Sequence, residues 1–315
     1  MNMSQILDRS FKIMEASFKD NLSLGVVLLL GPSILMGFAF HLCYALMANV
    51  AEDAFAGGGS FFNFAGFLAG FAAIMFAGLI LMFTHTTAMV AGTSMACGEL
   101  TGKPMRWQEA LSHTIWKRLM RGVGSTILLV LLMLGCILIP EILLIVGIGT
   151  RSIPLMSFGG VLFIPAFVLM LRYAVRWSMT IPVIASEDLG VIASIRRSSA
   201  LVQGTWWRLF GIILAFAIIA GFVMSVVLVP AVLLTMLGPI REYVNLVTSP
   251  EMIQADPSAI FRVFSRMGAG IGVLTFLQYM LYLIIVPACA SVLMFDLRAR
   301  KGELQPAPPT ETLGT

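Results

Sequence analysis

Charged residues are scarce in this chain of 315 residues. Asp, Glu, Lys and Arg make up 11% of it, whereas hydrophobic residues make up 59%. A soluble domain carries about 25% charged residues, and a globule of this size cannot hide so much apolar surface from water. The composition therefore excludes a soluble protein and indicates an all-α, polytopic membrane protein.

The sequence also lacks the usual patterns of a catalytic or metal-binding site. It has three His and four Cys, none with the spacing of metal ligands, and it has no HExxH or P-loop motif. The four Cys lie in or beside apolar runs, where a thiol is ordinarily a small hydrophobic residue, so no disulfide is predicted. No metal or other cofactor is expected, and the sequence favours a protein that is not an enzyme.

Six apolar runs are long enough to cross a hydrocarbon core of ~30 Å, which takes roughly 20 helical residues. The predicted transmembrane helices cover 22–47, 64–96, 122–148, 154–185, 209–237 and 269–295. Pro165 and Pro182 are the expected bends in the fourth, because proline removes a helical hydrogen-bond donor. Residues 1–303 are thus expected to form one six-helix domain, and residues 304–315 a disordered cytoplasmic tail.

Basic residues gather on one side of these six helices. With an even number of spans the two termini share a side, and fourteen of the 20 Lys and Arg flank the helices there, against four on the opposite side. Because cytoplasmic loops carry the excess of Lys and Arg, both termini are predicted to be cytoplasmic, with the chain in the cell (inner or plasma) membrane. Anionic lipid headgroups explain the excess of positive charge better than nucleic acid does.

An amphipathic stretch precedes each odd-numbered span. The first carries apolar residues at helical spacing from Leu7 to Phe18, the second begins at Trp107, and the third covers 192–209. Segments of this kind, with basic residues and Trp, lie at the level of the lipid headgroups. Three interfacial helices are therefore expected, with membrane lipids as their partners.

Ionisable residues within the spans are the leading functional candidates, since charge in a membrane is costly. Arg172 and Arg176 lie four apart in the fourth span and therefore on one helix face. Either they snorkel or pair structurally, or they bind an anion or a lipid phosphate; a bend at Pro182 would let Glu187 or that phosphate meet them. The basic residues Arg196, Arg197 and Arg208 complete the candidate set for anion or lipid binding.

His85 is a polar intramembrane candidate. It lies in the polar patch from Thr84 to Thr87 of the second span. Interhelical hydrogen bonding is the commonest use of such a residue, and a proton relay or a ligand site is the alternative.

Three stretches of the sequence resemble one bacterial family. They are Ile6-Leu7-Asp8-Arg9-Ser10-Phe11, then Arg176-Trp177 with Pro182, Glu187, Arg197-Ser198, Leu201, Gly204 and Trp207-Arg208, and finally Asp296-Leu297-Arg298-Ala299-Arg300-Lys301-Gly302. Together they are similar to the membrane domain associated with glycerophosphoryl diester phosphodiesterases, although Phe295 stands where Tyr is expected. The sequence lacks the His-Arg-Gly entry of the catalytic domain that some members carry. The resemblance therefore implies a stand-alone membrane module and not an activity.

The leading hypothesis is a non-catalytic integral membrane protein that scaffolds a membrane protein partner or engages lipid. A small transporter or lipid translocator is the alternative, which long helices broken by proline would suit. A membrane phosphodiesterase is less favoured, because it needs metal or acid–base groups at one depth.

Overall fold

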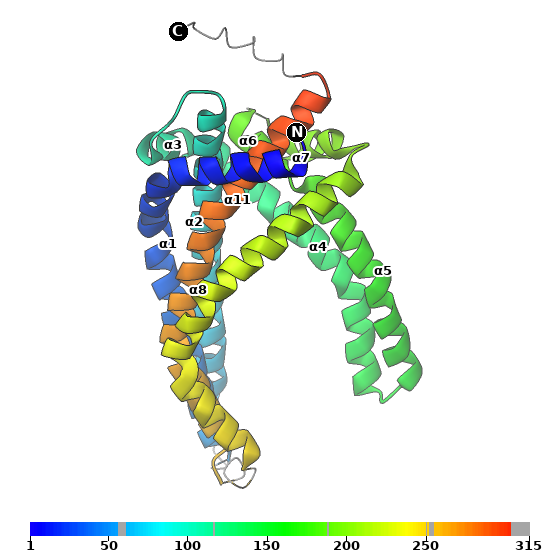
Figure 1. Ribbon diagram of the computed structural model, residues 1–315. Helices are drawn as coiled ribbons and strands as arrows, with labels where there is room; N and C mark the ends of the chain where they lie inside the picture. The colour runs from blue at the N-terminus through cyan, green and yellow to red at the C-terminus, as the bar shows by residue number, and fades with distance from the viewer. Residues whose placement is uncertain (56–60, 116, 188, 250, 252–254, 304–315) are drawn as a thin grey trace, which may run out of the picture. The chain divides into compact units, whose positions relative to one another are not determined.

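Helices dominate the computed structural model of the chain, and its described residues contain no strand (Figure 1). The structure describes residues 1–55, 61–115, 117–187, 189–249, 251 and 255–303. The all-α fold class predicted from the composition is confirmed. The predicted disordered tail, residues 304–315, lies outside the described residues.

The helices differ greatly in length. They are α1 (Met3–Phe55), α2 (Phe61–Leu100), α3 (Trp107–Thr114), α4 (Lys117–Gly149), α5 (Ile153–Trp177), α6 (Thr180–Ser186), α7 (Val191–Val202), α8 (Trp206–Thr248), α10 (Ala259–Arg266) and α11 (Gly268–Arg300). Six segments among the described residues are long and apolar enough to cross a membrane. This agrees with the six predicted spans and makes the chain a multi-pass membrane protein.

The fourth predicted span is two helices and not one bent helix. α5 ends at Trp177 and α6 begins at Thr180. Pro182 explains the break, because it has no N–H and its ring crowds the carbonyl of the residue four earlier, Ser178. Pro165, the other expected bend, lies inside the continuous α5.

The three amphipathic stretches also differ from one another. The second and third contain the separate helices α3 and α7, whereas the first is continuous with the apolar part of α1. No Gly or Pro occurs before Gly25, so nothing in the sequence ends the helix earlier. Likewise α8 continues through Pro239 to Thr248, beyond the predicted end at 237.

Contacts divide the chain into two compact units. Unit 1 comprises Met1–Ser17, Met89–Ala217 and Val286–Thr315, and unit 2 comprises Phe18–Ala88 and Ile218–Ile285. α1, α2, α8 and α11 contribute residues to both units, whereas α3 to α7 belong to unit 1 alone.

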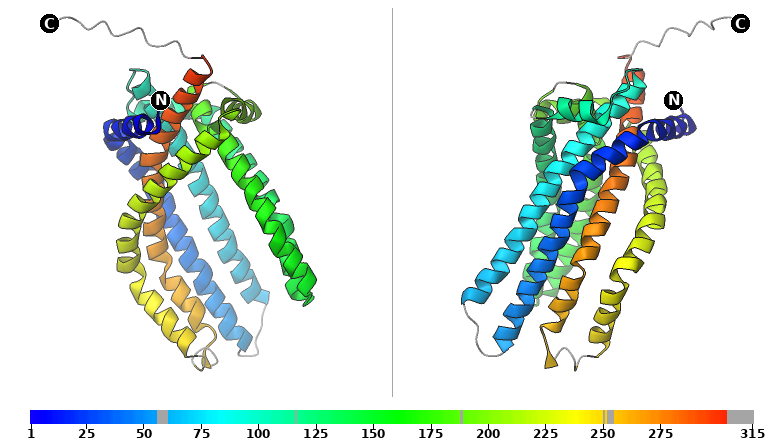
Figure 2. Two further views of the ribbon diagram at one scale, coloured as in Figure 1. Left: turned by 45° about the vertical axis from the view of Figure 1, so that its right-hand side comes forward. Right: turned by 90° about the vertical axis from the view of Figure 1, so that its left-hand side faces the viewer.

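In unit 2 four helix segments follow one another in the order α2, α1, α11, α8 (right-hand view of Figure 2). Glycine lets the backbones of α1 and α11 approach closely. A Cβ added to Gly37 would lie 2.5 Å from the carbonyl oxygen of Gly268, too close for any larger residue. A Cβ added to Gly70 of α2 would likewise lie 2.7 Å from the Cα of Cys43 in α1. Small residues let backbones pack in this way within lipid.

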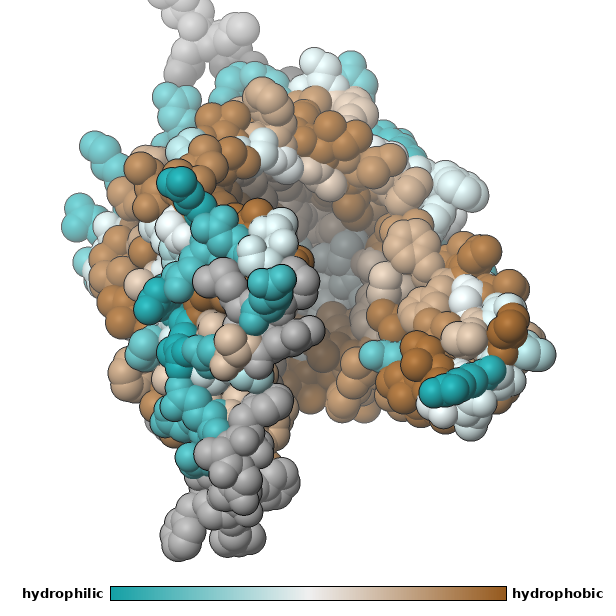
Figure 3. All heavy atoms as spheres, turned by 90° about the horizontal axis from the view of Figure 1, so that it is seen from below, coloured by the Kyte–Doolittle hydropathy of each residue, from teal (hydrophilic) through white to brown (hydrophobic). Residues whose placement is uncertain are grey.

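In unit 1 the helices α4 and α5 run side by side as a hairpin (Figures 1 and 2). Gly147 and Gly159 face the opposite helix so closely that a Cβ on either would touch it at 2.8 and 3.0 Å. The outward faces are apolar, with Ile139 63% and Ile164 68% exposed, and hydrophobic residues cover much of the helix flanks in Figure 3. Lipid is the medium that solvates such surfaces.

Candidate functional site

The broken end of α5 is held by α7. The Ser198 hydroxyl of α7 accepts a hydrogen bond from the backbone N–H of Met179 at 3.2 Å and donates one to the carbonyl of Arg176 at 3.0 Å. These backbone groups lie at the break before Pro182, and Ser198 is fully buried. A single side chain therefore satisfies both sides of the break and fixes α7 against α5.

A tight turn then brings the start of α8 to the same place. Gly204 has a φ of +86°, a left-handed conformation that glycine adopts without strain. Two residues later, the indole Nε1–H of Trp206 donates to the carbonyl of Arg172 at 3.3 Å. The first turn of α8 is thereby tied to the last turns of α5.

The helices α5, α7 and α8 enclose a groove of about 740 Å³ within unit 1. Its lining residues are Val168, Leu171, Arg172, Arg176, Ser199, Val202, Gln203, Trp206, Trp207 and Phe210. Two arginines, two tryptophans and two uncharged polar side chains thus share one groove with four apolar residues. We call this the α5–α8 groove.

Arg172 and Arg176 are the charged residues of the α5–α8 groove. Both side chains are exposed and both line the groove, which agrees with the shared helix face that their spacing of four predicts. Among the described residues neither guanidinium has a carboxylate partner, and no Asp or Glu lines the groove. The groove therefore carries two uncompensated positive charges.

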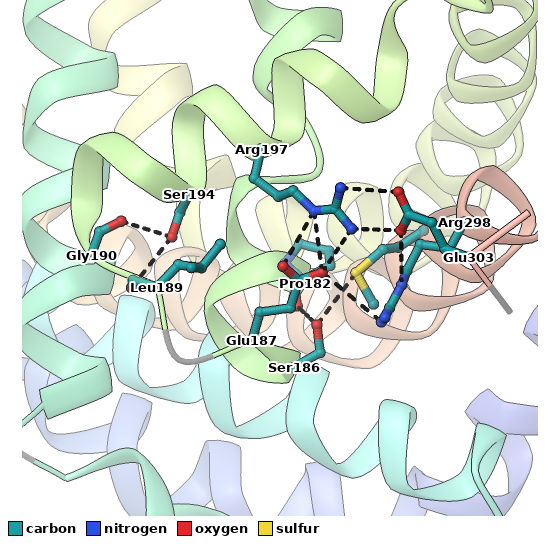
Figure 4. A network of polar contacts seen from close by, with 10 residues as sticks. Pro182, Ser186, Glu187, Leu189, Gly190, Ser194, Arg197, Arg298 and Glu303 are labelled. Atoms are coloured by element: carbon teal, nitrogen blue, oxygen red, sulfur yellow. Dashed lines mark hydrogen bonds and ion pairs between the residues drawn. The ribbon is translucent and has the colours of Figure 1, made fainter. Parts of the chain in front are cut away.

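Glu187 lies elsewhere, in a network with Arg197, Glu303 and Arg298 (Figure 4). The Nε of Arg197 donates to the Glu187 carboxylate at 3.2 Å, and its Nη2 donates to Glu303 at 2.5 Å. Arg298 of α11 lies 3.6 Å from Glu303 and 4.0 Å from Glu187. The alternative in which Glu187 meets Arg172 and Arg176 is therefore wrong, because Arg197 is its partner instead.

Arg197 and Glu303 of this network shift each other's pKa. The hydrogen bond from Arg197 lowers the pKa of Glu303 below its ordinary value, against a smaller opposing effect of burial. Conversely, the hydrogen bond to Glu303 is the main reason that the pKa of Arg197 is raised. Each charge thus stabilises the other.

A second network surrounds Asp296 of α11, whose side chain is 2% exposed. Its carboxylate accepts hydrogen bonds from Arg208 at 2.6 Å, from Arg300 at 3.1 Å and from the α-amino group of Met1 at 2.7 Å. Arg208 also donates to the carbonyl of Met1 at 2.7 Å. Arg208 is therefore engaged within the protein, although its neighbour Trp207 lines the groove.

The six predicted anion-site residues thus separate into three groups. Arg172 and Arg176 come together in the groove, Glu187, Arg197 and Arg208 are ion-paired within the protein, and Arg196 is exposed on α7. Sequence reasoning did not assign Ser199 and Gln203 to the site. The signal in the sequence that could have identified them is their position as uncharged polar residues just before the Trp206-Trp207 pair.

His85 lies in α2 and belongs to unit 2. Its ring contacts that of Tyr279 in α11, with centroids 4.4 Å apart. Its Nδ1 is buried and has no hydrogen-bond partner in the part of the chain that the structure describes. The described contact of His85 with α11 is thus the aromatic one to Tyr279.

Within the described ranges, no three His, Cys, Asp or Glu side chains gather as they would to hold a metal ion. Compared with protein-family models, with curated proteins and with solved structures, the chain gives no match.

Proposed function

We propose that this protein is a non-catalytic membrane module that binds the phosphate headgroup of an anionic lipid in the α5–α8 groove. One observation carries the proposal: Arg172 and Arg176 share that groove with Trp206 and Trp207, and neither arginine has a carboxylate partner among the described residues. Arginine offers a planar fork of donors that matches phosphate oxygens. Tryptophan, like tyrosine, is enriched at the membrane–water interface.

The position of the two arginines along α5 supports an interfacial headgroup. α5 begins at Ile153, so Arg172 lies about 28 Å along it at a rise of 1.5 Å per residue. That distance is close to the ~30 Å of a hydrocarbon core. The guanidinium groups are therefore expected at the level of the phosphates when Ile153 lies near the opposite surface.

The proposed family membership has support from the same unit. The residues that carry the resemblance to the membrane domain of glycerophosphoryl diester phosphodiesterases include Pro182 at the helix break and Ser198, which bridges it. They also include the ion pairs of Glu187 with Arg197 and of Arg208 with Asp296. In this proposal the shared residues maintain a frame for a lipid groove, which a membrane protein partner can also use as a scaffold.

The orientation belongs to the proposal. With both termini cytoplasmic in a bacterial inner membrane, the groove lies in the cytoplasmic leaflet. In a Cys-free background, a membrane-impermeant thiol reagent added to intact cells is expected to label Glu251→Cys and to leave Ala16→Cys unlabelled; both native side chains are exposed. The reverse pattern would contradict the orientation.

The lipid proposal is tested by measuring which lipids stay with the purified protein. Native mass spectrometry would compare wild type with the double variant Arg172→Gln/Arg176→Gln. The matched control is Arg151→Gln/Arg241→Gln, which removes two exposed arginines that do not line the groove. We expect the groove variant to retain about fivefold less anionic lipid. This factor corresponds to the loss of about 1 kcal/mol of binding free energy, as expected when exposed ion pairs are removed. Equal lipid in all three proteins would overturn the proposal.

The transport and phosphodiesterase alternatives make different predictions for the same preparations. A transporter would move lipid or solute across vesicles, and a phosphodiesterase would release products from glycerophosphodiesters. The membrane-module proposal expects neither activity in wild type, together with loss of bound lipid in the groove variant.

A further inference from the structure

The charge of the α5–α8 groove points to a particular class of lipid. Resting on the proposed function, we infer that the groove selects lipids whose phosphate is a monoester, such as phosphatidic acid, over lipids whose phosphate is a diester. A phosphomonoester carries a charge of about −1.5 to −2 at pH 7, whereas a phosphodiester carries one negative charge. The monoester therefore carries about 0.5 to 1 more negative charge at pH 7, and it has one more terminal oxygen.

The first support is charge balance. Arg172 and Arg176 are the two ionisable residues among those that line the groove, so the lining contributes two positive charges and no negative one. The nearby Arg197 and Arg208 are already ion-paired within the protein, with Glu187 at 3.2 Å and Asp296 at 2.6 Å. A phosphomonoester therefore neutralises most or all of the charge of the lining, whereas a diester leaves one guanidinium without a counter-charge.

The second support is geometry. Arg172 and Arg176 are one turn apart on α5, a spacing that places Cβ atoms about 5–6 Å apart. Two long guanidinium side chains at that separation can converge on one phosphate group. Each guanidinium can form two parallel hydrogen bonds to a pair of phosphate oxygens. Three terminal oxygens serve two such forks better than the two of a diester.

The third support concerns the remainder of the ligand, which we assign to a lipid and not to a soluble phosphate. Val168 and Trp207 line the same groove and are 59% and 78% exposed. Phe210 and Leu171 extend this apolar wall. An acyl chain would cover these surfaces, while the exposed side-chain amide of Gln203 offers N–H donors to the ester oxygens of the glycerol.

The test compares two lipids that differ by one methyl group. Phosphatidic acid and phosphatidylmethanol have the same glycerol and acyl chains, but the second is a diester. Each would be titrated, in nanodiscs of phosphatidylcholine, against wild-type protein and against Arg172→Gln/Arg176→Gln. We expect wild type to bind phosphatidic acid with about fivefold higher affinity than phosphatidylmethanol. One additional exposed ion pair accounts for a factor of about this size. The variant is expected to lose that preference.

The possible outcomes distinguish this inference from the proposal beneath it. Equal binding of both lipids to wild type, lost in the variant, would overturn the monoester inference and leave the headgroup site in place. Binding of neither lipid would overturn both. A preference for phosphatidic acid that persists in the variant would overturn the assignment to these arginines. Displacement of the lipid by equimolar glycerol 3-phosphate would overturn the choice of a lipid over a soluble phosphate.

Discussion

Two pairs of arginines in unit 1 have opposite surroundings. Arg197 and Arg208, in α7 and α8, contact the carboxylates of Glu187, Glu303 and Asp296. Arg172 and Arg176, in α5, have no carboxylate partner among the described residues and line an open groove. The comparison teaches that the positions of a few acids decide which positive charges hold the fold together and which stay available to a ligand.

The largest effect is expected from breaking the buried network. Asp296→Asn should lower the free energy of unfolding by about 3 kcal/mol. The reason is that Arg208 would lose its charged partner, the Asp296 carboxylate, whose side chain is only 2% exposed. The melting temperature in detergent measures this change. The control is Asp8→Asn, which removes an exposed ion pair with Lys12 and should cost less than about 1 kcal/mol. Equal losses in the two variants would show that burial of the pair is unimportant.

The next effect concerns the helix break beside the groove. Ser198→Ala should cost about 2 kcal/mol, because the N–H of Met179 and the carbonyl of Arg176 would lose a buried partner. Ser199→Ala is the neighbouring control, since among the described residues that hydroxyl bonds to the carbonyl of Ile195 within α7 and to no other group. Thermal unfolding distinguishes them, and a larger loss in the control would contradict the bridging role of Ser198.

A smaller and pH-dependent effect is expected at Glu303. Since Arg197 lowers the pKa of Glu303 below 4.5, this pair stabilises the protein above pH 4.5, and the contribution is lost as the pH falls through the lowered value. Glu303→Gln should therefore cost about 1 kcal/mol at pH 7, because the side chain is partly exposed. The difference in melting temperature between wild type and variant should shrink below pH 4.5. A difference that grows in acid would contradict the lowered pKa.

The smallest effect on stability is expected at the available arginines. Arg176→Lys and Arg176→Gln should each change the free energy of unfolding by no more than about 0.5 kcal/mol, since no carboxylate within the described residues would be left unpaired. Both should nevertheless lose lipid, because Lys lacks the planar fork of Arg. A large fall in melting temperature with unchanged lipid would show that Arg176 is structural.

The transmembrane helices were predictable from the sequence, but the partners of the charged residues were not. Long apolar runs identify spans because each is a local property of about 20 residues. In contrast, Glu303 is 106 residues from Arg197, and Asp296 is 88 residues from Arg208. No local pattern reveals that the end of α11 lies against α6, α7 and the start of α8.

The α5–α8 groove was predictable only in part, because local spacing identifies residues on one helix but not the other helices that contact it. The spacing of Arg172 and Arg176 correctly placed them on one face of α5. The proposed bend at Pro182 was replaced by a break, which sent Glu187 to Arg197. The Trp206 indole reaches the carbonyl of Arg172 because Gly204 turns the chain, and these two residues are 34 positions apart in the sequence.

The bridge made by Ser198 has a consequence for how the protein is made. Ser198 follows Met179 by 19 residues in the chain, so the end of α5 emerges from the ribosome before its permanent hydrogen-bond partner does. During that interval only water can satisfy the free backbone groups. The end of α5 is therefore expected to stay at the membrane surface, where Arg172 and Arg176 favour contact with headgroups. It stays there until α7 emerges and Ser198 forms its hydrogen bonds with Met179 and Arg176.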